Sequence, residues 1–429
     1  MKRSGAWAVL SVLILLLGVL VAPGWASSEK ILAAIDGISE RYNGVSQAIH
    51  GFKEVGQQEF KSSALLKEEL QKLGFAVTGD LKVPADLVKD GVAKTAFRAE
   101  LKGAAPGPTI TIMLEYDALA NGHSCGHNLI ATSGLLAAAG LAQVMKETPG
   151  RILVIGTPDE ERGSRGGGKV ALLEGGHFEG SDIVLITHPE DKWTLDQRFL
   201  AMKRTFFGFK GRTAHAAASP HKGINALRGV IQTFNNVDAL REHLRQDVRI
   251  HGIVTKGGEA VNVVPEYAQA EFAVRALDTT TMEDAYQKVV NAAKAAALST
   301  GATLEYKEPR VALKAPVAVP PLNALIAEKL KALGVRESDF EDKETMGSSD
   351  LGNVANAYPT VNVSFKIAPK GTAGHSDAFR DAAATPEAWK ATVRTGKALA
   401  LAAYDLLTQP AKVKEIAEKF QELKKAEGK

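Results

Sequence analysis

Residues 109–114 read TITIML and run directly into the polar triplet Glu115-Tyr116-Asp117. Six apolar or β-branched residues that end in acids are typical of a strand buried on both faces. Two more apolar runs, at residues 152–155 and 183–187, also end in polar residues, and helix-like stretches at residues 133–146 and 168–174 separate the three. This alternation predicts an α/β fold built on a doubly wound, mostly parallel sheet.

The polar residues after the three runs define one expected site. The second and third clusters are Asp159-Glu160-Glu161 and His188-Pro189-Glu190. Because ligands bind beyond the carboxyl ends of parallel strands, all three clusters are expected to meet at one edge of the sheet.

Between residues 200 and 309 the pattern changes to strand, helix, strand, strand, helix, strand. That order is typical of a ferredoxin-like α+β domain, and we expect an inserted lid and dimerisation domain there. The expected strands are residues 202–209, 249–255, 268–275 and 302–306, and the expected helices are residues 225–244 and 281–297. The catalytic domain would then comprise residues 27–199 and 310–410, its second part containing helices at 322–333 and 386–407 and a strand at 360–365, with a charged C-terminal helix at 411–429.

The N-terminus has the form of a secretory signal peptide, expected over residues 1–26. Lys2 and Arg3 precede an apolar run over residues 8–21, and small residues surround a cleavage point after Ala26. The run is short for a stable transmembrane helix, although an uncleaved anchor is the alternative. We expect the mature chain to be periplasmic or secreted.

The overall composition is that of a globular protein. Apolar residues make up 45% and charged residues 24%, and the formal net charge is +3. The chain has no basic tract with interleaved aromatic residues, so nucleic acid is not an expected partner.

The single cysteine, Cys125, lies in the segment His123-Ser124-Cys125-Gly126-His127-Asn128. One cysteine cannot form an internal disulfide, so it is an inert buried thiol, an intermolecular link or a ligand. Cys125 and His127 can face one metal ion because the intervening glycine lets the backbone turn, and both are good zinc ligands. A buried thiol beside a helix-capping histidine is the alternative.

Adjacent carboxylates at Glu160 and Glu161 repel each other unless a cation or hydrogen bonds compensate them. In such a pair one carboxylate can bind metal while the other accepts a proton; an acidic loop facing solvent is the alternative. His188 and His375 are further potential ligands, although single histidines usually pack or face solvent. Two more acids, Asp117 and Asp350, could orient the ligands from behind.

These motifs resemble those of the zinc-dependent aminoacylase and carboxypeptidase superfamily of metallopeptidases, in particular its branch of aminobenzoyl-glutamate hydrolases and related dipeptidases. The resemblance covers nearly the whole mature chain. It rests on residues 115–119 (EYDAL), 122–129 (GHSCGHNL), 160–161 (EE), 187–190 (THPE), 214–217 (AHAA) and 262–265 (NVVP).

The resemblance implies a role for each of these residues. It makes Glu160 the base that activates the attacking water, and it makes His215 the group that stabilises the oxyanion, commonly from across a dimer. Asn262 and Arg275 would hold a substrate carboxylate; ordinary strand and loop positions in a lid are the alternative. The two metal ions would be bound by Cys125, His127, Glu161, His188 and His375.

The chain also departs from parts of that superfamily. Auxin-conjugate hydrolases usually have aspartate where this chain has Asn128, which favours the aminobenzoyl-glutamate and dipeptide branch. Aminoacylases and carboxypeptidases have a histidine where this chain has Glu115, so Cys125 must complete the metal site.

We therefore expect a metal-dependent amidohydrolase that cleaves N-acyl amino acids, dipeptides or aminobenzoyl-glutamate-like conjugates, small amides that carry a carboxylate. Two divalent metal ions are expected, zinc first and manganese or cobalt as alternatives, in a homodimer formed through the lid. A hydrolytic deaminase of an aromatic amine is one competing hypothesis. A catalytically silent, metal-stabilised binding protein is another, and the intact Glu160 argues against it.

Overall fold

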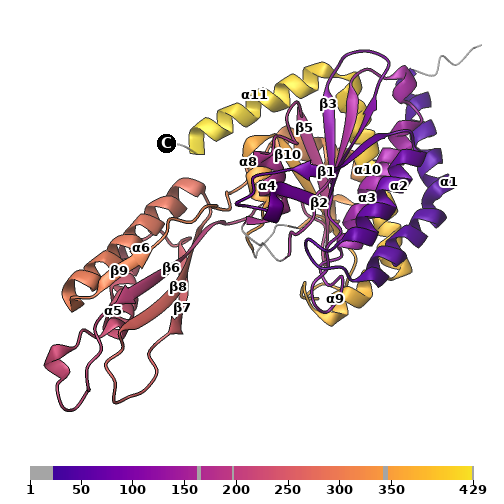
Figure 1. The fold of residues 1–429 in the computed structure, drawn as a ribbon. Coiled ribbons are helices and arrows are strands. Elements are labelled where there is room, and N and C mark those ends of the chain that lie inside the picture. The colour runs from indigo at the N-terminus through magenta and orange to yellow at the C-terminus, as the bar shows by residue number, and fades with distance from the viewer. Residues whose placement is uncertain (1–22, 162–165, 196–197, 342–345, 428–429) are drawn as a thin grey trace, which may run out of the picture.

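The computed structural model describes residues 23–161, 166–195, 198–341 and 346–427, and shows a large α/β domain with a smaller domain beside it (Figure 1). The first 22 residues of the predicted signal peptide lie outside the described part. Helix α1 (Pro23–Phe52) contains the predicted cleavage point after Ala26. Among the described residues, none of the helices has the length and apolar character needed to cross a membrane.

The large domain is built on a six-stranded sheet of order β1-β2-β4-β3-β5-β10. Strands β4, β3, β5 and β10 are parallel, and β2 and β1 add antiparallel at one edge, so the predicted doubly wound, mostly parallel sheet is confirmed. The strands are β1 (Ala76–Lys82), β2 (Val92–Lys102), β3 (Thr109–Leu114), β4 (Arg151–Gly156), β5 (Ile183–Glu190) and β10 (Thr360–Lys366).

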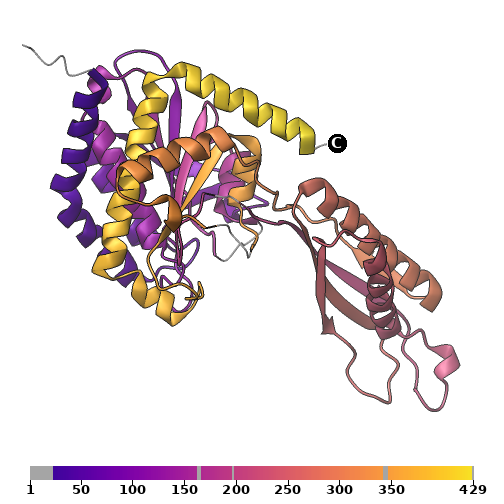
Figure 2. The same cartoon turned by 180° about the vertical axis from the view of Figure 1, so that it is seen from behind.

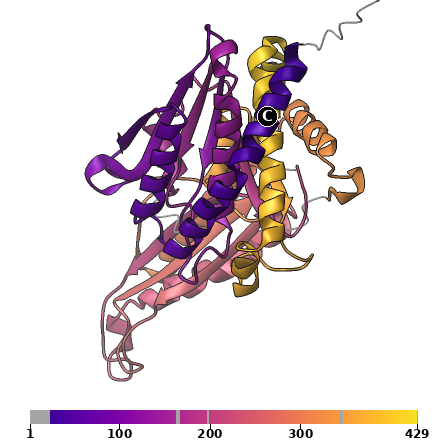
Figure 3. The same ribbon diagram turned by 90° about the vertical axis from the view of Figure 1, so that its right-hand side faces the viewer.

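Helices cover both faces of this sheet, as the views from behind and from the side show (Figures 2 and 3). One face packs against a core that includes Ile35, Leu135 and Leu399. The helices on that face are α1, α2 (Phe60–Lys72), α3 (His127–Ala142), α7 (Pro320–Ala332), α10 (Pro386–Thr408) and α11 (Pro410–Glu427); the opposite face packs against α4 (Gly168–Glu174) and α8 (Leu351–Ala357).

The strand order places a ligand-binding edge where the sequence predicted it. Central β3 lies between β4 and β5, and the parallel strands all point their carboxyl ends to the same side. Strand β3 continues into α3 on one face of the sheet, whereas its neighbour β4 continues into α4 on the other face, and such a divergence opens a crevice beyond the strand ends.

The smaller domain, which we call the lid, has the predicted ferredoxin-like arrangement. Its elements are β6 (Ala201–Lys210), α5 (Ala226–Leu240), β7 (Arg249–Lys256), β8 (Tyr267–Ala276), α6 (Thr279–Thr300) and β9 (Thr303–Tyr306). The sheet order is β7-β8-β6-β9 with antiparallel neighbours, and α5 and α6 bury one face of it. Phe206 and Ile253 are exposed apolar side chains of these strands.

Candidate metal centre

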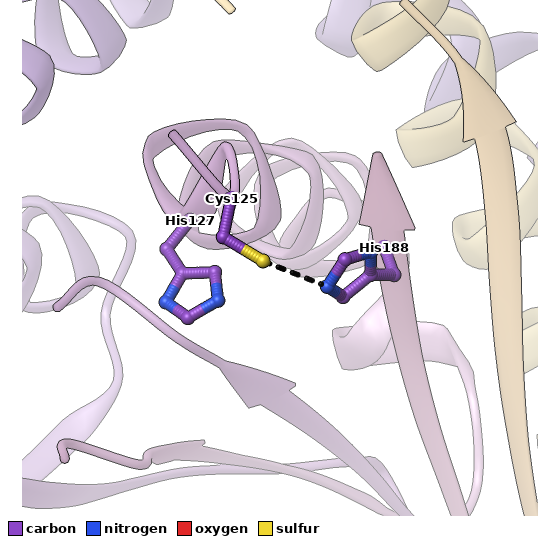
Figure 4. Close-up of side chains that lie close together, drawn as sticks. All are labelled: Cys125, His127 and His188. Carbon is purple, nitrogen blue, oxygen red and sulfur yellow. Dashed lines mark hydrogen bonds between the residues drawn. The ribbon is translucent and has the colours of Figure 1, made fainter. Parts of the chain in front are cut away.

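Cys125 and His127 are placed by the turn that starts α3. Gly126 adopts the left-handed conformation at φ 75°, and α3 begins at His127, six residues earlier than the stretch predicted from the sequence. Cys125 Sγ lies 3.4 Å from His188 Nε2, and the three side chains lie close together beyond the strand ends (Figure 4). The imidazole of His127 is oriented by Asp117, whose Oδ1 lies 2.9 Å from His127 Nδ1.

The loop after β4 supplies Glu161. Its backbone N–H donates to Asp117 Oδ2 at 2.9 Å, so Asp117 orients two predicted ligands at once. Glu161 Oε1 lies 3.8 Å from His127 Nε2, and Oε2 lies 3.5 Å from His375 Nε2. The structure therefore brings together potential ligands from the segments that follow β3, β4 and β10 and from the end of β5.

The predicted ligands form overlapping groups whose donor atoms lie within 4.8 Å of one another. The groups are Cys125, His127 and His188; Cys125, Glu161 and His375; and His127, Glu160 and Glu161. All of them except the fully buried His127 line one cavity together with Glu115, Glu190 and Ser349.

The chemistry of these donors fits divalent cations. Burial raises the pKa of the Cys125 thiol and that of the Glu161 carboxyl, so both need nearby positive charge to ionise fully. Within the described part of the chain, His127 Nε2 and Glu161 Oε1 are buried and make no hydrogen bond. Buried polar atoms are rarely left unpaired, so a bound cation would satisfy both.

Sequence reasoning missed two residues that contact the acids of this site. Ser349 Oγ donates to Glu160 Oε1 at 2.7 Å. Lys169 is fully buried, and its Nζ lies 2.8 Å from Glu115 Oε1 and 2.6 Å from Asp350 Oδ1. Asp350 was predicted to orient the ligands from behind, and the structure places both of its carboxylate oxygens against Lys169, whose backbone N–H and Nζ donate to them.

Replacing Lys169 by methionine is expected to lower the free energy of unfolding by about 3–5 kcal/mol, because two carboxylates would lose their buried cation. Burial alone would lower the pKa of Lys169, but Asp350 and Glu115 outweigh it and raise that pKa. Denaturant unfolding of the chelated chain measures the effect. Lys203→Met is the matched control: the side chains of its partners Glu283 and Glu308 are 42% and 53% exposed and stay hydrated without it, so a loss of about 1 kcal/mol or less is expected. Equal losses would contradict the prediction.

The three predicted site residues of the lid differ in whether they contact the metal cavity. Arg275, on β8, donates from Nη1 to Ser348 Oγ at 3.4 Å, and Ser348 lines the metal cavity. His215 and Asn262 sit in neighbouring loops, where the backbone N–H of Ala216 donates to the Asn262 carbonyl at 3.0 Å. Neither of these two lines the cavity formed by this chain.

Comparison with known proteins decides the family. The model of the peptidase dimerisation domain (M20) matches residues 202–301. The Xaa-Arg dipeptidase of Mus musculus is 32% identical over 403 residues, covering 90% of this chain and 90% of that protein. This chain belongs to the M20 family of metallopeptidases. Like its relatives, this M20 protein is a metal-dependent amidohydrolase.

Other similar proteins agree with that family. A p-aminobenzoyl-glutamate hydrolase chain of Escherichia coli (strain K12) is 32% identical over 294 residues, covering 63% of this chain and 58% of that protein. The structure of a putative aminohydrolase from methicillin-resistant Staphylococcus aureus matches with a TM-score of 0.73 at 19% identity, over 89% of this chain and all of that one. A dinuclear metal-binding M20 peptidase from Bacillus subtilis has a TM-score of 0.65 at 19% identity, over 86% of this chain and 99% of that one. These two structural likenesses support the M20 fold.

Proposed function

We propose that this M20 enzyme hydrolyses the amide bond of a small substrate that carries a free carboxylate next to that bond. The substrate would be an N-acyl amino acid, a dipeptide or an aminobenzoyl-glutamate-like conjugate. One observation carries this proposal: Glu160 lies beside the assembled ligand groups and is held there by Ser349, where it can serve as a general base.

The residues of this chain divide the chemistry between them. Cys125, His127, Glu161, His188 and His375 would hold two divalent ions, with zinc the first choice for a mixed sulfur, nitrogen and oxygen set. Bound there, such ions acidify water and polarise a carbonyl group. Glu160 accepts the proton of the attacking water and then delivers it to the leaving nitrogen.

Arg275 supports a substrate with a carboxylate. Its Nε is buried and makes no hydrogen bond among the described residues. Arg249 on β7 pairs with Arg275. Burial of Arg275 and the positive charge of Arg249 both lower the pKa of Arg275. Two paired arginines, one of which contacts Ser348 at the wall of the cavity, favour an anion, and a planar guanidinium binds a carboxylate through two parallel hydrogen bonds.

His215 and Asn262 would act from a second copy of the chain. Because neither lines the cavity of its own chain, a homodimer through the lid gives them a route to a site. There His215 would stabilise the oxyanion, and Asn262 would bind the substrate carboxylate with Arg275. The enzyme would act in the periplasm or outside the cell after cleavage of the signal peptide.

A panel of N-acyl amino acids, dipeptides and aminobenzoyl-glutamate tests the proposal. We expect at least one of them to be cleaved, the activity to vanish with chelator and to return with zinc, and methylation of the substrate carboxylate to abolish cleavage. Metal binding without cleavage of any member would contradict the proposal and favour the deaminase or the binding protein.

A further inference from the structure

The loop between α1 and α2 contacts the two segments that carry Asp117 and Glu160, although the sequence suggested no role for it. At its start, the Glu54 carbonyl accepts a hydrogen bond from Ala118 N–H at 2.8 Å, and Val55 pairs with Ala118. The loop is therefore fixed to the segment that follows β3 and carries Asp117.

Three residues of this loop converge on Asp159, the neighbour of Glu160. Glu59 Oε1 accepts a hydrogen bond from Asp159 N–H at 2.9 Å, and Gln57 Nε2 donates to Asp159 Oδ2 at 2.7 Å. Gly56 approaches so closely that a Cβ there would lie 2.0 Å from Asp159 Oδ1. Only glycine fits at that point, so the loop and Asp159 are packed as one unit.

Asp159 is held in an uncommon backbone conformation, at φ 62°. Most residues with a side chain avoid the left-handed region; aspartate enters it more readily than most, and the contacts from Gly56, Gln57 and Glu59 favour it here. This conformation turns the chain after Pro158 so that Glu160 reaches Ser349 and Glu161 reaches the ligand group. The direction of the general base therefore depends on what holds Asp159.

Glu59 makes its contact with Asp159 in the interior of the protein, where both residues are buried. Glu59 is fully buried, and its Oε2 accepts a hydrogen bond from Thr95 Oγ1 at 2.8 Å. Burial raises the pKa of Glu59 to about 8, and the charge of Asp117 adds to this. Near neutral pH the carboxyl therefore holds a proton much of the time. A glutamine could keep both contacts, with its Oε1 accepting from Asp159 N–H and its Nε2 donating to Thr95 Oγ1.

We propose that Glu59 is a positioning residue for hydrolysis: its bond to the backbone of Asp159 maintains the left-handed turn that directs Glu160 into the metal cavity. The inference rests on the proposed role of Glu160 as the base. Glu59 touches neither substrate nor metal and acts through Asp159.

Kinetics of Glu59→Ala and Glu59→Gln, with metal content measured on the same samples, test the inference. Glu59→Ala should lower kcat about 10- to 100-fold, since displacing a catalytic group by about 1 Å has effects of that size. KM should stay within about twofold and both metal ions should stay bound, because neither the substrate sites nor the ligands change. Glu59→Gln should keep kcat close to that of the wild type.

Two more variants separate positioning from general stability. Thr95→Val removes the other hydrogen bond of Glu59 but leaves the one to Asp159, so kcat should be nearly unchanged. Gly56→Ala adds a methyl group that clashes with the Asp159 side chain and should lower kcat with KM unchanged. This variant tests the inference even if Glu59→Ala does not fold.

The inference is overturned if Glu59→Ala or Gly56→Ala keeps the wild-type kcat. It is also overturned if Glu59→Ala and Thr95→Val lower kcat, metal content and melting temperature together, because that pattern would mean that Glu59 only stabilises the fold. Undiminished activity of Glu160→Gln would instead overturn the base role itself.

Discussion

Glu160→Gln is expected to lower kcat by about 10²- to 10⁴-fold, the usual contribution of a general base, with both metal ions still bound. Glutamine has nearly the shape of glutamate, and its amide oxygen can still accept the hydrogen bond from Ser349 Oγ. It cannot accept the proton of the attacking water. The loss should therefore fall on kcat and leave KM nearly unchanged, as steady-state kinetics with metal analysis will show.

The adjacent carboxylate is the matched control for this experiment. Glu161 lies in two of the ligand groups, so Glu161→Gln should lose bound metal together with activity. If Glu160→Gln keeps more than about one tenth of the wild-type kcat, Glu160 is not the general base.

Mixing two inactive variants should restore activity if the lid of one protomer completes the site of the other. A heterodimer of Glu160→Gln and His215→Ala would contain one site with both residues intact. Random exchange of protomers would then give about one quarter of the wild-type activity, because half of the dimers are mixed and each has one working site. Activity is measured after the two variants are unfolded and refolded together.

For the baseline, each variant is refolded alone and the two samples are mixed only after refolding. Sites formed within one chain would give no restoration, since every site would lack either Glu160 or His215. A monomer in solution would produce the same negative result, so sedimentation of the wild type completes the experiment.

The sequence predicted the parallel strands and the lid because these follow local periodicity. The apolar run at residues 109–114 is buried throughout β3, which is the pattern of a central strand. Strands β1 and β2 were not predicted. In β1 exposed and partly buried residues alternate, and this strand joins the sheet by pairing with β2, which local pattern does not show.

The candidate metal ligands could be picked out from the sequence because they are unusual residue types at strand ends, and the structure brings them together. Contacts between ordinary residues far apart in sequence could not be found in that way. Lys169 looks like a surface lysine in a glycine-rich segment, and only the fold places it between Glu115 and Asp350. The contact of Glu59 with Asp159 joins residues in different loops, and it too required the structure.

The pairing of β5 with β10 has a consequence for biosynthesis. Val184 pairs with Thr360 and Glu190 with Lys366, yet the whole lid is inserted between the two strands in the chain. During translation β5 therefore has one edge unpaired while the lid, whose four strands form a sheet of their own, can already fold. An unpaired apolar edge invites association between nascent chains. Truncation before β10 should thus leave the lid folded and the rest of the protein dependent on chaperones.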